Sequence, residues 1–172
     1  MAGGRLRAAL LAAGAVLLAA LLVAAIGAPL GLFAGKRPAD LGLHDGRLRG
    51  GDWRPNWVCS QASAGDATHH VEALAFTGEP GAAWDALEGA VRAIPRSNIV
   101  SRDARYMHVE FSSRALGFVD DAEFVLDAPA RLIHLCSRAR LGVRDFGVNR
   151  QRVESLRAAL AARTKRGGPP AT

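Results

Sequence analysis

The clearest strand-to-helix transition in the chain lies in Ser112–Arg157, SSRALGFVDDAEFVLDAPARLIHLCSRARLGVRDFGVNRQRVESLR. Within it, Phe118–Leu126 and Arg131–Ser137 alternate in the manner of strands that bury one face. From about residue 148 to 163 the apolar spacing becomes that of a helix. The apolar stripe of this helix consists of Val153, Leu156 and Leu160.

The same two patterns continue toward the N-terminus. Strands are predicted over residues 71–77, 99–102 and 106–112, and an amphipathic helix begins at Pro80 and ends before Pro95. The resulting element order is β-α-β-β-β-β-α. This order predicts an α+β fold, a two-layer sandwich in which both helices cover one face of an antiparallel sheet.

An uncharged apolar run precedes the predicted domain. Ala8–Ala34 contains no charged residue, and the 21 residues before Pro29 would form a helix about 31 Å long at 1.5 Å per residue. A hydrocarbon core is about 30 Å thick, so this length predicts a transmembrane signal anchor. A cleaved signal peptide is the alternative, although its apolar region is usually shorter.

The composition divides the chain into four parts. We expect an N-terminal anchor over 1–34, a flexible tether rich in Gly, Arg and Asp over 35–54, a small α+β domain over 55–162 and a disordered basic tail over 163–172. The short basic N-terminus predicts a single-pass protein of the inner or plasma membrane whose domain lies on the periplasmic, extracytoplasmic side. Basic residues beyond the apolar run argue for the opposite orientation by the positive-inside rule.

A family resemblance runs through the same stretch. It is carried by FVDDAEF at Phe118–Phe124 and by GVNRQR at Gly147–Arg152, together with single residues between them. Those single residues are Ser137, Arg140, Gly142 and Asp145. In these features the chain resembles the domain-of-unknown-function family 1499, in order over roughly Pro55 to Leu160. The resemblance implies a small, often membrane-associated domain and assigns no chemistry.

Charge is unevenly distributed along the chain. Residues 41–162 carry 15 Arg and 15 acidic residues, so the net positive charge of +6 lies outside them. This distribution favours contact with a membrane over contact with nucleic acid. Within the domain, residues 41–130 have 8 Arg against 13 acidic residues, whereas residues 131–162 have 7 Arg against 2. The two parts either pair across the fold or leave an arginine face for an anionic ligand.

The two cysteines, Cys59 and Cys136, lie in neither a CxxC nor a zinc-like spacing. In an oxidising compartment they can form one disulfide, which chain entropy would make worth about 4 to 5 kcal/mol. The alternative is two free thiols.

Side chains that can bind an anion gather at the end of the last strand and in the loop that follows. Arg138 and Arg140 share one face if the strand continues, and Asp145 or Asn149 can cap the next helix. The candidate binding residues are Arg138, Arg140, Arg144, Asp145, Asn149, Arg150, Asp120 and Asp121. The alternative is that Arg140 pairs with one of the two neighbouring aspartates and fixes the fold.

The chain carries no GxSxG, HExxH or phosphate-cradling glycine motif and no aromatic-basic strand. Asp120 and Asp121 are adjacent on a strand, so their side chains should lie on opposite faces and form no carboxylate dyad. We therefore expect no catalytic residue, metal, cofactor or nucleic-acid partner.

The sequence favours a membrane-anchored envelope protein that acts as a binding or interaction module. Its expected partners are the membrane and either an anionic ligand or an envelope protein. One alternative is a hydrolase that acts on an anionic substrate through Asp120 or Asp121, and another is a structural subunit of a membrane complex.

Overall fold

An antiparallel sheet forms the centre of the domain in the computed structural model, which describes residues 2–166. The elements in chain order are α1 (Ala2–Gly27), β1 (Trp57–Cys59), β2 (Leu74–Ala75), α2 (Pro80–Arg92), β3 (Ser97–Arg102), β4 (Tyr106–Ser112), β5 (Val119–Asp127), β6 (Leu132–Ala139) and α3 (Val148–Arg166). The strand order is β1-β6-β5-β4-β3, and β2 also pairs with β6. Every strand pair is antiparallel, which confirms the predicted α+β sandwich.

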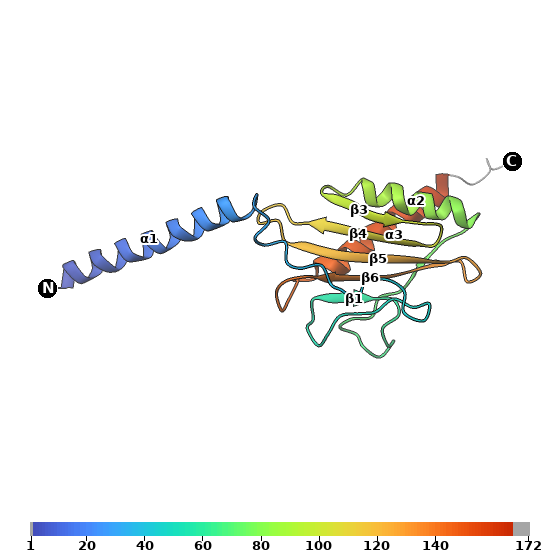
Figure 1. The fold of residues 1–172 in the computed structure, drawn as a ribbon, viewed down its shortest axis with the longest axis horizontal. Helices are drawn as coiled ribbons and strands as arrows, with labels where there is room; N and C mark the ends of the chain where they lie inside the picture. Colours follow the sequence, from blue (N-terminus) through green and yellow to red (C-terminus); the bar gives the residue numbers. More distant parts are fainter. Residues whose placement is uncertain (1, 167–172) are drawn as a thin grey trace.

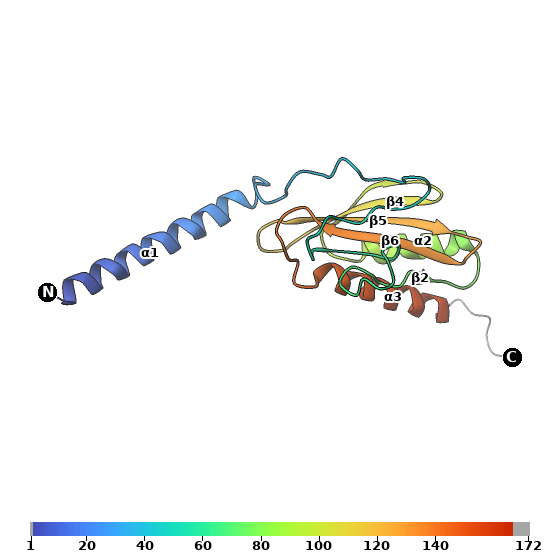
Figure 2. The same ribbon diagram turned by 90° about the horizontal axis from the view of Figure 1, so that it is seen from below.

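Helices α2 and α3 cover one face of the sheet (Figure 2). Alternation along β5 directs Ala122, Phe124 and Leu126 toward these helices, where all three are buried. The same core cluster contains Trp84, Leu87 and Val91 on α2 and the predicted stripe of α3, Val153, Leu156 and Leu160. Burial of each large apolar side chain stabilises the fold by about 1.5 to 3 kcal/mol, so this layer supplies the main core.

The largest differences from the sequence prediction concern β1, β2 and the end of α3. Strand β1 is not predicted, because three residues are too few to establish a period. The strand expected over residues 71–77 is reduced to the two residues of β2. Helix α3 continues to Arg166, so residues 163–166 of the expected tail are helical, and residues 167–172 lie outside the described residues.

Cys59 and Cys136 form a disulfide, as the sequence allows. The two residues lie opposite each other in the ladder between β1 and β6, with their Cα atoms 4.0 Å apart. Both are buried with Leu48 and Val125 on the face of the sheet that points away from the helices. The bond therefore holds the short edge strand β1 onto β6.

Residues 36–56, called here the cover segment, run across the face of the sheet opposite α2 and α3 (Figure 2). Arg37 pairs with Glu110, and the amide of Gly42 donates a hydrogen bond to Glu123. Leu48 is buried. The sequence predicts a tether over most of this segment and does not anticipate its contacts with the sheet.

Helix α1 extends away from the domain (Figure 1). The helix Gly3–Gly27 is 25 residues long, its most apolar window of 18 residues has a mean hydropathy of 2.8, and no residue of that window is buried against the rest of the protein. This helix is long and apolar enough to cross a membrane. Length and composition alone do not distinguish a membrane anchor from a signal sequence.

Candidate functional site

The face of the sheet under the cover segment carries a connected set of polar side chains. Alternation along β4, β5 and β6 directs every second residue to this face. We call this set the buried polar network; it consists of Tyr106, His108, Glu110, Asp121, Glu123 and Arg140. Only 1% of Asp121 and 2% of Glu123 is exposed to solvent.

Arg140 lies at the centre of this network. Its Nε and Nη2 donate to the two carboxylate oxygens of Asp121 at 2.7 and 2.8 Å, and Nη2 also donates to Glu110. His108 Nε2 lies 2.8 Å from Oδ1 of Asp121. Burial by itself would raise the pKa of Asp121, but the hydrogen bonds with Arg140 and His108 outweigh it, and the pKa is lowered. The same pairing raises the pKa of Arg140, so both groups stay charged.

The two glutamates of the network experience different surroundings. Burial tends to raise the pKa of Glu110, but hydrogen bonds from Arg37 and Arg140 lower it overall. Glu123 accepts hydrogen bonds from the Gly42 amide at 2.5 Å and from the Tyr106 hydroxyl at 2.7 Å. Burial dominates at Glu123 and raises its pKa. The network therefore contains two carboxylates, Asp121 and Glu110, that arginines hold ionised, and a third, Glu123, that is easier to protonate.

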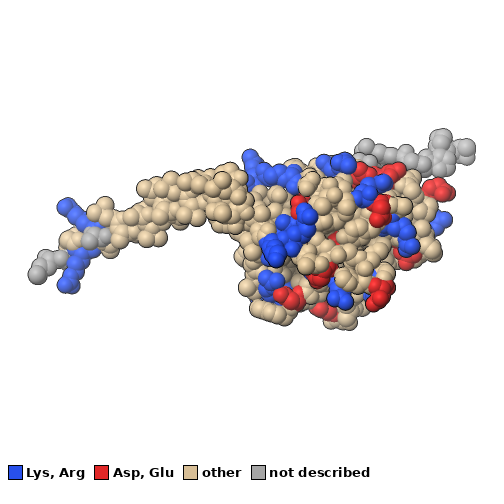
Figure 3. Space-filling view, in the orientation of Figure 1, with Lys and Arg blue, Asp and Glu red and all other residues tan. Residues whose placement is uncertain are grey.

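A cleft of about 420 Å³ lies beside this network, between the cover segment and the end of β6. We call it the basic cleft; its charged lining consists of Lys36, Arg54, Arg138 and Arg140, with Asp40 and Asp52. Figure 3 shows basic side chains gathered on this side of the domain, next to the end of α1. The charged lining thus holds more basic than acidic groups.

Two arginines of the basic cleft have donors to spare. Arg138 binds both oxygens of Asp40 through Nη1 and Nη2, at 3.2 and 2.7 Å, and lowers the pKa of that carboxyl. Its Nε is buried and has no hydrogen-bond partner among the described residues. Within the same part of the chain, Nη1 of Arg140 donates no hydrogen bond. Guanidinium donors of this kind form charge-assisted hydrogen bonds with carboxylate and phosphate oxygens.

One wall of the basic cleft depends on two glycines. A Cβ at Gly50 or Gly51 would lie 2.4 or 2.5 Å from the Trp57 ring, so only glycine lets this backbone approach the indole. The ring is also stacked on His69, with centroids 3.9 Å apart, and its Nε1 donates to the Asp52 carbonyl at 2.7 Å. Trp57 therefore fixes the position of the loop that lines the cleft.

A comparison with known protein families gives one match, over the part of the chain that forms the sheet, α2 and most of α3. The family described as "Protein of unknown function (DUF1499)" matches residues 52–160, which run from the wall of the basic cleft to α3. This chain belongs to the DUF1499 family. The DUF1499 match excludes α1 and most of the cover segment, including Lys36 and Asp40. A comparison with curated proteins found no match to this chain.

The candidate binding residues lie in separate places on the DUF1499 domain. Arg138 and Arg140 share the basic cleft, as their spacing predicts. Arg150 lies on α3, in the opposite layer, and donates to backbone carbonyls of residues 67, 68 and 70. Arg144 is exposed in the loop between β6 and α3. The four arginines therefore do not form one continuous face.

The remaining candidates have structural partners. Asp145 accepts hydrogen bonds from the backbone amides of Gly147 and Asn149, at 3.0 and 2.9 Å, and so caps the start of α3 as expected. Asn149 is buried and bridges this cap to Ser137.

Asp120 points to the helix layer and pairs with Arg152 at 2.7 Å, whereas Asp121 points to the buried polar network. The two aspartates thus lie on opposite faces, as predicted. Asp121 pairs with Arg140, as in the alternative that Arg140 bonds one of the two aspartates and fixes the fold.

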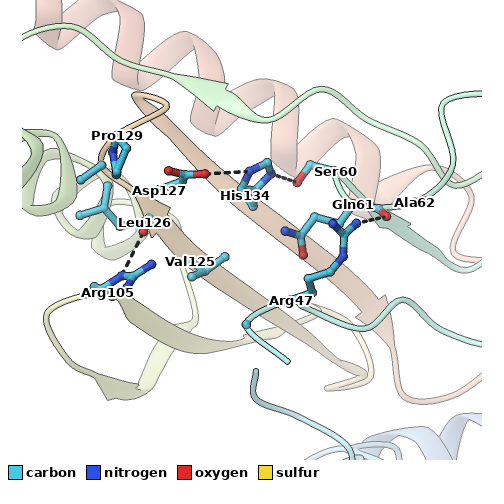
Figure 4. A pocket seen from close by; sticks show the side chains of 12 residues that line it. Arg47, Ser60, Gln61, Ala62, Arg105, Val125, Leu126, Asp127, Pro129 and His134 are labelled. Atoms are coloured by element: carbon cyan, nitrogen blue, oxygen red, sulfur yellow. Dashed lines mark hydrogen bonds and ion pairs between the residues drawn. The ribbon is translucent and has the colours of Figure 1, made fainter. Parts of the chain in front are cut away.

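A second cavity, of about 640 Å³, lies toward the other end of β6 (Figure 4). There His134 lies between Ser60 and Asp127, with Nδ1 3.3 Å from Ser60 Oγ and Nε2 3.9 Å from Asp127 Oδ2. In a Ser-His-Asp triad the carboxylate bonds Nδ1 of the histidine and the serine bonds Nε2. Here the two partners of His134 are exchanged, in the row formed by Ser60, His134 and Asp127. Ser60 Oγ also accepts the Leu135 amide at 2.9 Å, so it continues the pairing of β1 with β6. We assign this row no catalytic role.

Proposed function

We propose that this chain is a membrane-anchored binding module whose basic cleft holds an anionic group of an envelope component. The observation that carries the proposal is the position of Arg138 and Arg140. Arg138 lies in β6 and Arg140 directly after it, both line the cleft, and each has a donor that no described residue accepts. Planar guanidinium groups with free donors are well suited to carboxylate and phosphate oxygens.

The charge balance of the cleft favours a small ligand. Asp40 and Asp52 line it alongside the basic residues, and much of the Arg140 charge is already balanced by Asp121. A small ligand that carries one phosphate, diphosphate or carboxylate group fits this balance better than a polyanion such as nucleic acid. The volume of about 420 Å³ lies within the usual range for small-molecule sites.

We further propose that the domain lies on the extracytoplasmic side of the inner or plasma membrane, anchored by α1. The disulfide between Cys59 and Cys136 supports this location, because such bonds persist in oxidising compartments. Free thiols of the full chain can be alkylated in intact cells, and the labelling of Cys59 and Cys136 can be compared before and after reduction. Protection of both thiols until reduction is expected, and thiols that react directly would contradict the proposed side.

The binding proposal is tested with the full chain purified in detergent micelles. Native mass spectrometry shows whether a ligand is retained, and inorganic pyrophosphate then serves as a defined probe in calorimetry. Arg138→Gln removes one guanidinium from the cleft. Loss of a charge-assisted hydrogen bond of about 1.5 to 3 kcal/mol should weaken binding roughly tenfold or more.

Arg92→Gln is the matched control, because Arg92 is exposed on α2 and pairs with Glu88 on the helix side of the sheet. It removes the same charge and should leave binding unchanged. Lys36→Gln provides a second test at an exposed position, in case Arg138→Gln impairs folding. A wild-type protein that retains no ligand and binds no pyrophosphate, or two cleft variants that bind as well as Arg92→Gln, would exclude the basic cleft as an anion site.

A further inference from the structure

Large apolar side chains gather at the end of the domain next to α1. The group, called here the apolar end, consists of Phe118, Leu141, Val143, Phe146 and Val148, all exposed. Among the described residues beyond 40, the other large exposed apolar side chains are Leu43 and Trp53, both in the cover segment. Single exposed apolar residues are ordinary, but a cluster at one end of a domain marks a contact surface.

Phe146 is the most exposed member of this group, with 94% of its surface accessible. Its φ angle of 55° is in the left-handed region, which is costly for a residue with a side chain. Hydrogen bonds of Asp145 hold this loop, because its carboxylate accepts the Gly147 amide at 3.0 Å and its carbonyl accepts the Val148 amide at 3.2 Å. The loop therefore holds the Phe146 ring in a fixed, exposed conformation. The ring does not contribute to the core of the domain.

The apolar end lies where α1 joins the domain. The rings of Phe33 and Phe118 pack with centroids 5.7 Å apart, just after α1 ends. Gly35, with a φ of 69°, lies so close to β6 that a Cβ there would be 2.8 Å from Cβ of Arg140 and 2.9 Å from Cγ of Leu141. Figure 1 shows the end of α1 beside the loops of this end. A helix that spans the hydrocarbon core thus brings the apolar end to the bilayer surface.

Basic groups and a cavity accompany the apolar side chains. Arg114 and Arg144 are exposed on the two loops at this end, and neither has a hydrogen bond or ion pair with another described residue. A cavity of about 420 Å³ lies between the loops, and its lining includes Phe111, Phe146 and Arg144. Aromatic rings beside arginines are typical of protein surfaces at the level of lipid headgroups.

We propose that the apolar end inserts Val143 and Phe146 into the headgroup region of the leaflet next to α1, with Arg114 and Arg144 against lipid phosphates. The occupant of this surface is the phospholipid bilayer that α1 crosses. The contact is separate from the basic cleft and sets how the domain lies on the membrane. The basic cleft opens under the cover segment and shares no charged lining residue with the cavity of the apolar end.

The test uses the full chain in lipid nanodiscs that contain an anionic phospholipid. Phe146→Trp adds a fluorophore at the apolar end, and Ala130→Trp adds one in the exposed turn between β5 and β6, at the far end of the strands. The emission of the wild-type protein is subtracted from both. In lipid brominated near the headgroup, the added emission of Phe146→Trp should be blue-shifted and quenched, whereas that of Ala130→Trp should be neither.

Three outcomes would overturn the proposal. The first is added emission from Phe146→Trp that remains unquenched and at the wavelength of a hydrated indole. The second is a ring that is shielded only after a second protein is added, which would make the apolar end a protein interface. The third is a chain that does not remain with the nanodisc, because α1 then does not hold the apolar end at a bilayer. Unchanged pyrophosphate binding by Phe146→Trp separates this test from that of the basic cleft.

Discussion

Replacing Arg140 by Met should destabilise the domain strongly. Only 7% of the Arg140 side chain is exposed, and its guanidinium neutralises Asp121, whose side chain is fully buried, and Glu110. Methionine keeps most of the apolar stem but leaves both carboxylates without this partner. Removing one member of a buried ion pair costs about 3 to 5 kcal/mol, because the remaining charge stays desolvated. This is a large part of the roughly 5 to 15 kcal/mol that stabilises a typical domain.

Urea unfolding of the full chain in mild detergent, followed by the fluorescence of buried Trp84, measures this loss. Arg92→Met is the control: it removes an equally basic side chain, but its ion pair with Glu88 lies on the surface of α2. Exposed pairs contribute about 0 to 1 kcal/mol, so the control should be close to wild type. If Arg140→Met and Arg92→Met unfold within about 1 kcal/mol of each other, the network does not stabilise the fold as argued.

The pH dependence gives a second check on the same variant. In the wild type the pKa of Asp121 is lowered, so the stability that it contributes is present above its unfolded pKa and is lost as the pH falls through the folded value. Without Arg140, burial should instead raise the pKa of Asp121, and protonation should relieve the unpaired charge. The difference between wild type and Arg140→Met should therefore shrink as the pH approaches about 4. A constant difference across this range would contradict the assignment to Asp121.

Three other predictions concern the same domain. Reducing the bond between Cys59 and Cys136, which closes a separation of 77 residues, should lower the free energy of unfolding by about 4 to 5 kcal/mol in urea titrations with and without reductant. Asp120→Asn should cost less in the same assay than Asp121→Asn, because burial raises the pKa of Asp120 whereas that of Asp121 is lowered; equal losses would contradict this reasoning. Burial also raises the pKa of Glu123, so the stability linked to its protonated form is lost as the pH rises through its folded pKa. Glu123→Gln should flatten that part of the stability profile, and an unchanged slope would exclude Glu123 as its source.

The sequence predicts the main layers well because they depend on local periodicity. Alternation along β4, β5 and β6 and the apolar stripes of α2 and α3 define which residues meet in the core. Strand β1 carries no such pattern and exists because its backbone pairs with β6 and Cys59 bonds to Cys136. The cover segment has the composition of a linker, and its position becomes clear only once the sheet presents Glu123 and Arg138 to it.

The candidate site was predictable in part. The opposite charges of residues 41–130 and 131–162 indicate pairing, and the bond between Arg140 and Asp121 is a case of it. Glu110 and His108 alternate with apolar residues in the sequence, but only the register of β4 against β5 brings them beside Asp121. Periodicity gives the face of a strand on which a residue lies and not its neighbour across the sheet, so these partners are absent from the predicted set.

The cover segment explains why charged residues on this face of the sheet are joined in ion pairs. In a two-layer sandwich the face opposite the helices is open to water, and charged residues there need no partners. Here the cover segment encloses them, so each buried charge requires a counter-charge, and Arg37 and Asp40 supply two of these from the chain that follows α1. Both ion pairs therefore balance charge under the cover segment and fix the sheet to the chain that follows α1. In the membrane-anchored protein that we propose, a domain held in this way has a set orientation at the bilayer, which a surface that inserts side chains into one leaflet requires.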